Sequence, residues 1–93
     1  MLGGNIDDFL FDLSCGFDLI FIFRGKKFFL EGYIDDGDKP TYFMWTLDPP
    51  AKDYSLVLVG NGVHLPIDEF LALKIWDGKT FMEVENEIRW VDF

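Results

Sequence analysis

Apolar and polar residues alternate along FDLIFIFRGKKFFLEGYI, residues 17–34, with the two-residue period of β-strands. Two such runs flank a short segment around Gly25, which predicts a β-hairpin with a two-residue turn at Arg24-Gly25 or at Gly25-Lys26. Both registers give the same two faces. The apolar, core-facing set is Phe17, Leu19, Phe21, Phe23, Phe28, Leu30 and Ile34. The mixed, outer set is Asp18, Ile20, Ile22, Lys27, Phe29, Glu31 and Tyr33.

Helical signals lie on both sides of this hairpin. Residues 6–15 form an amphipathic stripe between Asn5, a suitable N-cap, and Gly16, a suitable helix end. A short second helix is predicted from Pro66 to the region of residue 74. Thr80 and Glu83 have capping-box spacing, so a third helix is predicted there, and residues 89–93 either continue it or form an extended tail. Its predicted inward side chains are Phe81, Val84 and Ile88.

Two further strands are predicted, over residues 41–47 and 54–60, bounded by proline and glycine. In the first of them we expect the larger side chains to join the core and the others to join the outer face. The expected core members are Phe43, Trp45 and Leu47. The expected outer members are Tyr42 and Met44, with Val57 and Val59 of the next strand.

Together these elements predict one α+β domain over residues 1–93, with element order αββββαα. Short connections imply a four-stranded antiparallel meander, with one N-terminal and two C-terminal helices mainly on one sheet face. An equally weighted alternative has a helix crossing over the outer face, which would give three layers and bury both faces of the sheet.

Charge narrows the possible partners. The net charge is −9, which disfavours direct binding to nucleic acid, because phosphates must be neutralised by Lys and Arg. The acidity either keeps a very apolar small protein soluble or directs it to a basic protein surface. The longest apolar run, residues 19–23, is too short for a membrane span, no signal peptide is visible and the single cysteine suits a reducing compartment. These features predict a cytoplasmic protein that does not bind membranes.

Candidate chemistry is sparse. Cys15 and His64 are the one nucleophile–base combination, but a thiolate is disfavoured at a helix carboxyl terminus, so a small buried structural cysteine is the favoured interpretation. Asp35, Asp36 and Asp38 suggest a calcium loop, but Pro40 interrupts the EF-hand spacing and a solvated turn explains them. No nucleotide-binding glycine pattern is present. We therefore expect no catalytic residue, cofactor or metal.

The outer sheet face combines apolar, aromatic and methionine side chains with charges at its margin, as interface cores do. The predicted partner-binding residues on this face are Ile20, Ile22, Phe29, Glu31, Tyr33, Tyr42 and Met44. A second, acidic group on the predicted third helix is Glu83, Glu85 and Glu87. If charge drives binding, these carboxylates would imitate phosphates toward a basic groove. The partner is expected to be a protein, which includes a second copy of the chain.

Two stretches, GFDLIFIFRGKKFFL and IWDGKTFMEVENEIRW, resemble small uncharacterised proteins of Gram-positive bacteria and their phages. The resemblance rests on Gly16, the strand at 19–23, the Gly25-Lys26 tip and the Asp77-Gly78-Lys79-Thr80 turn with Glu83. These positions are turns, caps and core, so the resemblance implies a fold and no catalytic residue. A looser similarity in size and charge links the chain to small acidic inhibitors, such as anti-CRISPR proteins and toxin-immunity proteins.

The favoured function is a non-enzymatic, acidic protein-binding domain that inhibits a phage-defence nuclease or acts as an immunity protein. The alternatives are a homodimeric accessory protein and a small enzyme that uses Cys15. The lack of converging catalytic groups in the sequence favours the first.

Overall fold

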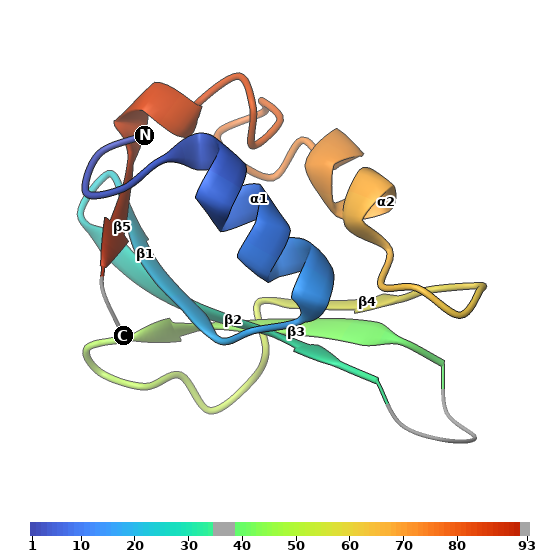
Figure 1. Cartoon of the computed structure of the whole chain (residues 1–93). Helices are drawn as coiled ribbons and strands as arrows, with labels where there is room; N and C mark the ends of the chain where they lie inside the picture. The colour runs from blue at the N-terminus through green and yellow to red at the C-terminus, as the bar shows by residue number, and fades with distance from the viewer. Residues whose placement is uncertain (35–38, 92–93) are drawn as a thin grey trace.

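The computed structural model describes residues 1–34 and 39–91, which form an α+β fold with a five-stranded antiparallel sheet (Figure 1). The strand order is β4-β3-β2-β1-β5. The helices are α1 (Ile6–Cys15), α2 (Ile67–Ala72) and the 3-10 turn η1 (Glu85–Glu87). The strands are β1 (Leu19–Phe23), β2 (Lys26–Tyr33), β3 (Thr41–Leu47), β4 (Leu56–Val59) and β5 (Ile88–Val91). The predicted antiparallel meander is confirmed for β1–β4, and β5 is an addition at its β1 edge.

Helix α1 has the predicted bounds because both of its caps form. The Asn5 side chain accepts a hydrogen bond from the Asp7 N–H, which satisfies one of the N–H groups that the helix leaves unpaired. Gly16 is left-handed, with φ 78°, and its N–H donates back to carbonyls of the last turn. The predicted stripe is confirmed by the full burial of Phe9 and Leu13.

The hairpin turns at Arg24-Gly25, where both residues have positive φ, and Phe23 therefore pairs with Lys26. The five predicted core residues within these strands are buried: Leu19, Phe21, Phe23, Phe28 and Leu30. The prediction is wrong for Phe17 and Ile34, which are 56% and 57% exposed. Both lie outside β1 and β2, so strand alternation no longer determines their direction.

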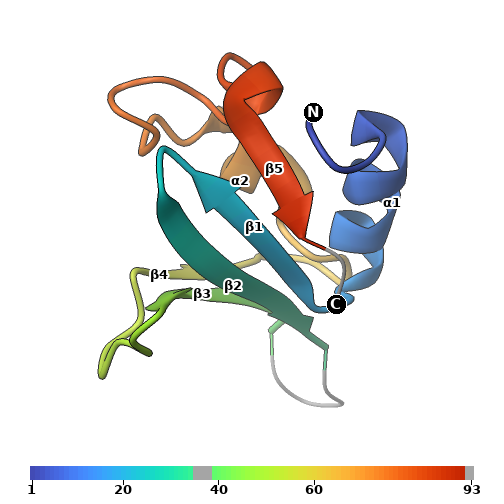
Figure 2. The same ribbon diagram turned by 90° about the vertical axis from the view of Figure 1, so that its left-hand side faces the viewer.

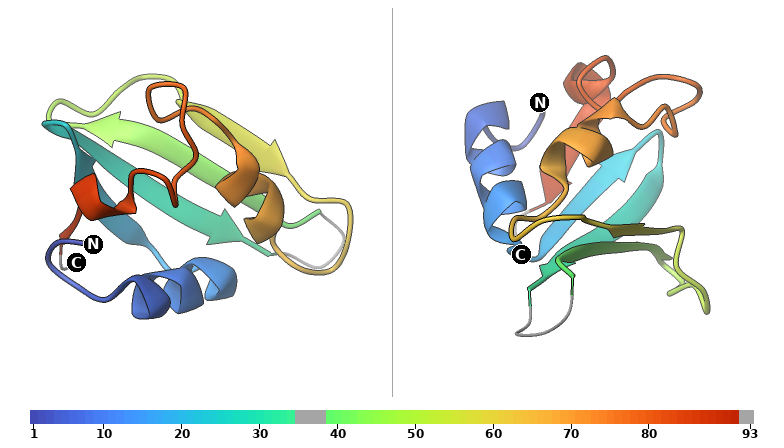
Figure 3. Two further views of the ribbon diagram at one scale, coloured as in Figure 1. Left: turned by 90° about the horizontal axis from the view of Figure 1, so that it is seen from above. Right: turned by 90° about the vertical axis from the view of Figure 1, so that its right-hand side faces the viewer.

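Both helices lie on one face of the sheet, which confirms that part of the prediction. Figure 1 shows α1 and α2 above the sheet, and Figure 3 shows them from above, with α2 toward the β4 side. No helix of residues 1–34 or 39–91 covers the opposite face. The three-layer alternative is therefore wrong for the part of the chain that the structure describes.

Strand β3 has the predicted bounds but the opposite orientation. Tyr42 and Met44, expected outside, are 0% and 2% exposed and belong to the core. The three residues expected in the core, Phe43, Trp45 and Leu47, lie on the outer face instead. The register against β2 sets this orientation: Met44 pairs with the buried Leu30, so Met44 and the Tyr42 ring lie on the inner face. The ring is held there by a 2.7 Å hydrogen bond from its hydroxyl to the Leu13 carbonyl, and burial raises the pKa of this phenol.

The predicted third helix is wrong, although its capping box forms. The Thr80 N–H donates to the Glu83 carboxylate at 2.9 Å, and the Glu83 N–H donates to the Thr80 hydroxyl at 3.3 Å. The chain then makes only turns and η1 before β5, whose Ile88 pairs with Phe23 of β1. Pairing with the sheet thus replaces continuation of the helix. Figure 2 shows β5 beside β1, with the amino-terminal segment nearby.

The core between helices and sheet is largely aromatic. The Phe81 ring lies 5.3–6.0 Å from four other ring centroids, contributed by α1, β1, α2 and the turn after α2. These four rings are those of Phe9, Phe21, Phe70 and Trp76. Phe81 thus packs against both helices and the sheet.

Candidate functional site: the outer face of the sheet

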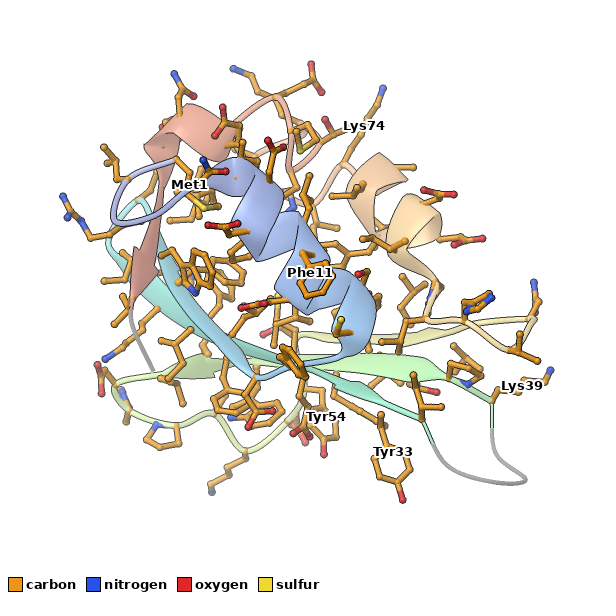
Figure 4. The ribbon with its side chains drawn as sticks, viewed as in Figure 1. Met1, Phe11, Tyr33, Lys39, Tyr54 and Lys74 are labelled. Atoms are coloured by element: carbon orange, nitrogen blue, oxygen red, sulfur yellow. The ribbon has the colours of Figure 1, made fainter. Side chains whose placement is uncertain are left out.

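The face of the sheet opposite the helices carries a cluster of aromatic side chains. Phe29 of β2 stacks on Trp45 of β3 with ring centroids 4.6 Å apart. Tyr54, from the segment between β3 and β4, lies against both Phe43 and Trp45, at 5.0 and 5.4 Å. Figure 4 shows Tyr54 and Tyr33 on the side of the sheet away from α1. Tyr54 is 55% exposed and Tyr33 50%, so the cluster reaches solvent at its margin.

Aliphatic side chains extend this outer face from β1 to β4. Ile20 and Ile22 of β1 contribute half-buried side chains, and Val57 and Val59 of β4 are 49% and 51% exposed. Leu47 adds a half-buried side chain at the end of β3. From here on, "outer face" denotes Ile20, Ile22, Phe29, Glu31, Tyr33, Phe43, Trp45, Leu47, Tyr54, Val57 and Val59.

Charged groups lie among these apolar residues. Lys27 forms an ion pair with Asp48 at 3.3 Å. Glu31 pairs with Phe43 across the strands, and partial burial, reinforced by the nearby Asp18 carboxylate, raises the pKa of Glu31. A carboxylate at this position is therefore partly dehydrated by its aromatic neighbours.

Glu31→Gln is expected to stabilise the protein at pH 7 by up to about 0.5 kcal/mol. A raised folded-state pKa means that the contribution of Glu31 is fully present below its ordinary pKa of 4.5 and is lost as pH rises through the raised value. The advantage of the variant should therefore shrink toward pH 3.5. Urea unfolding of the wild type and of Glu31→Gln between pH 3.5 and 7 measures this difference in stability. Asp18→Asn is the control, because removing that carboxylate should lower the Glu31 pKa. If the stability advantage of Glu31→Gln grew as the pH was lowered, the raised pKa of Glu31 would be contradicted.

The acidic C-terminal residues do not form the predicted helical group, because no α-helix forms there. The Glu83 carboxylate accepts from the Thr80 N–H, which lowers its pKa, and Glu85 lies 2.7 Å from the Met1 amino group. Glu87 accepts from Arg24 at 3.0 Å, and this bond lowers the pKa of Glu87. Each carboxylate thus has a partner within the chain, and the helical spacing assumed for phosphate imitation does not occur.

Arg24 links the hairpin tip to the C-terminal segment. Its guanidinium donates to Asp77 as well as to Glu87, which raises its own pKa, and it lies 5.0 Å from the Phe23 ring centroid. A hollow of about 530 Å³ at this tip is lined by Arg24, Lys27 and Asp48, among others. Arg24 and Lys27 are both paired with carboxylates, so neither presents an uncompensated positive charge to the hollow.

The structure brings together five of the predicted partner-binding residues and separates the rest. Ile20, Ile22, Phe29, Glu31 and Tyr33 share the outer face. Tyr42 and Met44 lie on the opposite side of β3, in the core. Sequence reasoning missed Phe43, Trp45 and Tyr54. Spacing offers no signal for the first two, because both alternating sets of positions in β3 carry apolar side chains.

The candidate catalytic residues, Cys15 and His64, lie in different exposed segments. Cys15 is exposed at the end of α1, so the prediction of a buried cysteine is wrong, and His64 is exposed in the segment before α2. Within residues 1–34 and 39–91, no three His, Cys, Asp or Glu side chains are placed to hold a metal ion. The candidate calcium loop, Asp35, Asp36 and Asp38, lies outside the described residues.

The fold and surface define a small two-layer α+β protein with an aromatic sheet face opposite its helices. No protein-family model matches the sequence, no curated protein is detectably similar to it, and no solved structure matches its fold. Neither helix of the described part of the chain has the length and apolar character needed to cross a bilayer.

Proposed function

We propose that this chain is a non-enzymatic protein-binding domain whose outer face contacts a protein with an apolar patch in a basic surround. The observation that carries the proposal is that aromatic and aliphatic side chains span the outer face, with no described helix over it. Contiguous apolar surface of this kind marks interaction sites in small proteins. Tyr33, Tyr54, Val57 and Val59 of this face are each about half exposed.

The composition of the outer face suits a protein partner. Interface cores are enriched in Trp, Tyr and Phe, which bury a large area with few rotatable bonds. Trp45 contacts both Phe29 and Tyr54, so these three rings are already ordered before binding. Ordered aromatic groups lose less conformational entropy on association, which strengthens binding.

The net charge of −9 is the reason for proposing that the partner's apolar patch has a basic surround. Long-range attraction accelerates encounter with a cationic surface, while the contact itself is made by the apolar face. Nucleases and many toxins that act on nucleic acid carry such cationic surfaces, because they must neutralise phosphates. We therefore place inhibition of a phage-defence nuclease or a toxin first among the possible roles of the domain.

Ile22→Glu combined with Leu47→Glu tests the proposal. Both side chains lie on the outer face and are half-buried, so the two carboxylates would disrupt an apolar contact without emptying the core. The tagged wild-type protein should retain a partner from cells that the double variant does not retain. The matched control combines Glu83→Gln, Glu85→Gln and Glu87→Gln, which neutralises the acidic segment and should retain the partner.

Circular dichroism and thermal unfolding establish that the double variant is folded before its binding is compared. Equal retention of the same partner by the folded double variant would place binding elsewhere and overturn the proposal. Unfolding of the double variant would show that the outer face is part of the core, which also overturns it.

A further inference from the structure

The two edges of the sheet differ in how their backbone groups are satisfied. At the β5 edge, the Leu2 N–H donates to the Ile88 carbonyl and the Trp90 N–H donates to the Leu2 carbonyl, both at 2.8 Å. These two bonds form a parallel bridge that closes this edge against further pairing. At the β4 edge, no described residue makes a corresponding bridge, and β4 is the terminal strand of the sheet.

The register of β4 against β3 identifies the backbone groups that point outward. The Gly60 N–H donates to the Pro40 carbonyl at 2.7 Å, which makes these two residues a hydrogen-bonded pair. Hydrogen-bonded and non-hydrogen-bonded pairs alternate along antiparallel strands. Leu58 therefore bonds toward Tyr42 of β3, while the N–H and C=O groups of Val57 and Val59 point away from the sheet. Four strong hydrogen-bonding groups are thus presented along one short edge.

This edge also lacks the charged residues and prolines by which many edge strands avoid pairing. The segment between Asp53 and His64 contains neither a charged residue nor a proline, although the whole chain carries a charge of −9. Lysine, glutamate or proline on an edge strand normally prevents contact with other strands. Val57 and Val59 instead present side chains that are 49% and 51% exposed.

We propose that the β4 edge pairs with the β4 edge of a second copy of this chain, antiparallel and about a two-fold axis at Leu58. In this register Val57 of each copy lies opposite Val59 of the other, and each such pair exchanges two backbone hydrogen bonds. The valines of the two copies become cross-strand neighbours on the outer face. The result is one continuous sheet with both outer faces on the same side.

A second copy is the occupant that these observations favour, because the two-fold axis matches each donor with an acceptor of an identical strand. The uncharged segment also lets two acidic chains approach at this edge with less repulsion than elsewhere. The inference does not depend on the proposed function, since it concerns backbone groups at the edge and not the side chains of Ile22 or Leu47.

Sedimentation equilibrium over micromolar to millimolar concentration should give a mass approaching twice the 10.8 kDa of one chain. Dimerisation should strengthen as salt is raised, because two chains of charge −9 repel each other less when screened. Val57→Pro removes an outward N–H and no bond to β3, so it should keep the fold and weaken dimerisation at least tenfold. Val57→Ala keeps that N–H and should remain close to wild type.

A pair of charge variants tests the register independently of proline. Val57→Lys with Val59→Lys places like charges opposite each other across the two-fold axis, and should be monomeric. Val57→Lys with Val59→Glu places opposite charges there, and should recover the dimer. A monomeric wild type at millimolar concentration overturns the proposal. So does a dimer that persists in Val57→Pro, or two charge variants with equal dissociation constants.

Discussion

Phe81→Ala is expected to lower the free energy of unfolding by about 3–5 kcal/mol. The ring is fully buried and lies within 6.0 Å of four other aromatic centroids, so its removal leaves a cavity where α1, α2 and the sheet meet. Small domains are stable by only about 5–15 kcal/mol, so much of the total stability would be lost. Urea unfolding followed by circular dichroism measures the effect.

Phe11→Ala is the matched control, because Phe11 is 64% exposed and projects from α1 toward the viewer in Figure 4. It should change the free energy of unfolding by no more than about 0.5 kcal/mol. If the Phe81 and Phe11 variants lost equal stability, the aromatic core described between the helices and the sheet would be wrong.

Gly32→Ala should destabilise the protein by about 1–3 kcal/mol. A Cβ atom at residue 32 would lie 2.7 Å from the Gly16 Cα atom and 2.6 Å from a Leu65 methyl carbon. Leu65 could rotate, but Gly16 is backbone at the end of α1, and the Gly32 N–H donates to its carbonyl. The substitution therefore has to push α1 away from β2.

Differential scanning calorimetry measures this change, since 1 kcal/mol corresponds to about 4–8 °C in a domain of this size. Gly62→Ala is the control: a Cβ atom there meets nothing within 4 Å, so its melting temperature should stay constant or rise. Equal melting temperatures for the two variants would contradict the close approach of Gly16 and Gly32.

The elements that the sequence predicted well are those determined by neighbouring residues. Asn5 and Gly16 fix both ends of α1 through bonds within a few residues. The hairpin around Gly25 is also local, and both turn positions considered give the same five buried residues of β1 and β2. Local hydrogen bonds of this kind can be read from spacing alone.

Strand β3 shows where such reading fails. Its sequence TYFMWTL is apolar at both alternating sets of positions, so the pattern alone cannot distinguish inside from outside. The orientation is decided by the register against β2, in which Met44 pairs with the buried Leu30, and by the hydrogen bond from Tyr42 to Leu13, which joins residues far apart in the chain. The two faces of the sheet were therefore predicted correctly on β1 and β2 and inverted on β3.

In the C-terminal segment, a local helix-start pattern forms but pairing with the sheet replaces the helix. The capping box of Thr80 and Glu83 forms as its spacing predicts, yet no α-helix follows. Residues Ile88–Val91 are rich in β-branched and aromatic side chains, and β1 offers them an unpaired edge. Pairing with β1 buries Ile88 completely, which a solvated helix end would not achieve to the same extent.

The central claim, that the outer face and not the acidic segment makes the contact, is tested most directly by calorimetric titration with the purified partner retained by the wild-type protein. Ile22→Glu with Leu47→Glu should weaken affinity at least 100-fold, equivalent to about 2.7 kcal/mol. The triple Glu→Gln variant at residues 83, 85 and 87 should lose less than tenfold, and wild-type binding should show a negative heat-capacity change from apolar burial. A loss confined to the triple variant, with full affinity in the outer-face variant, would contradict the account.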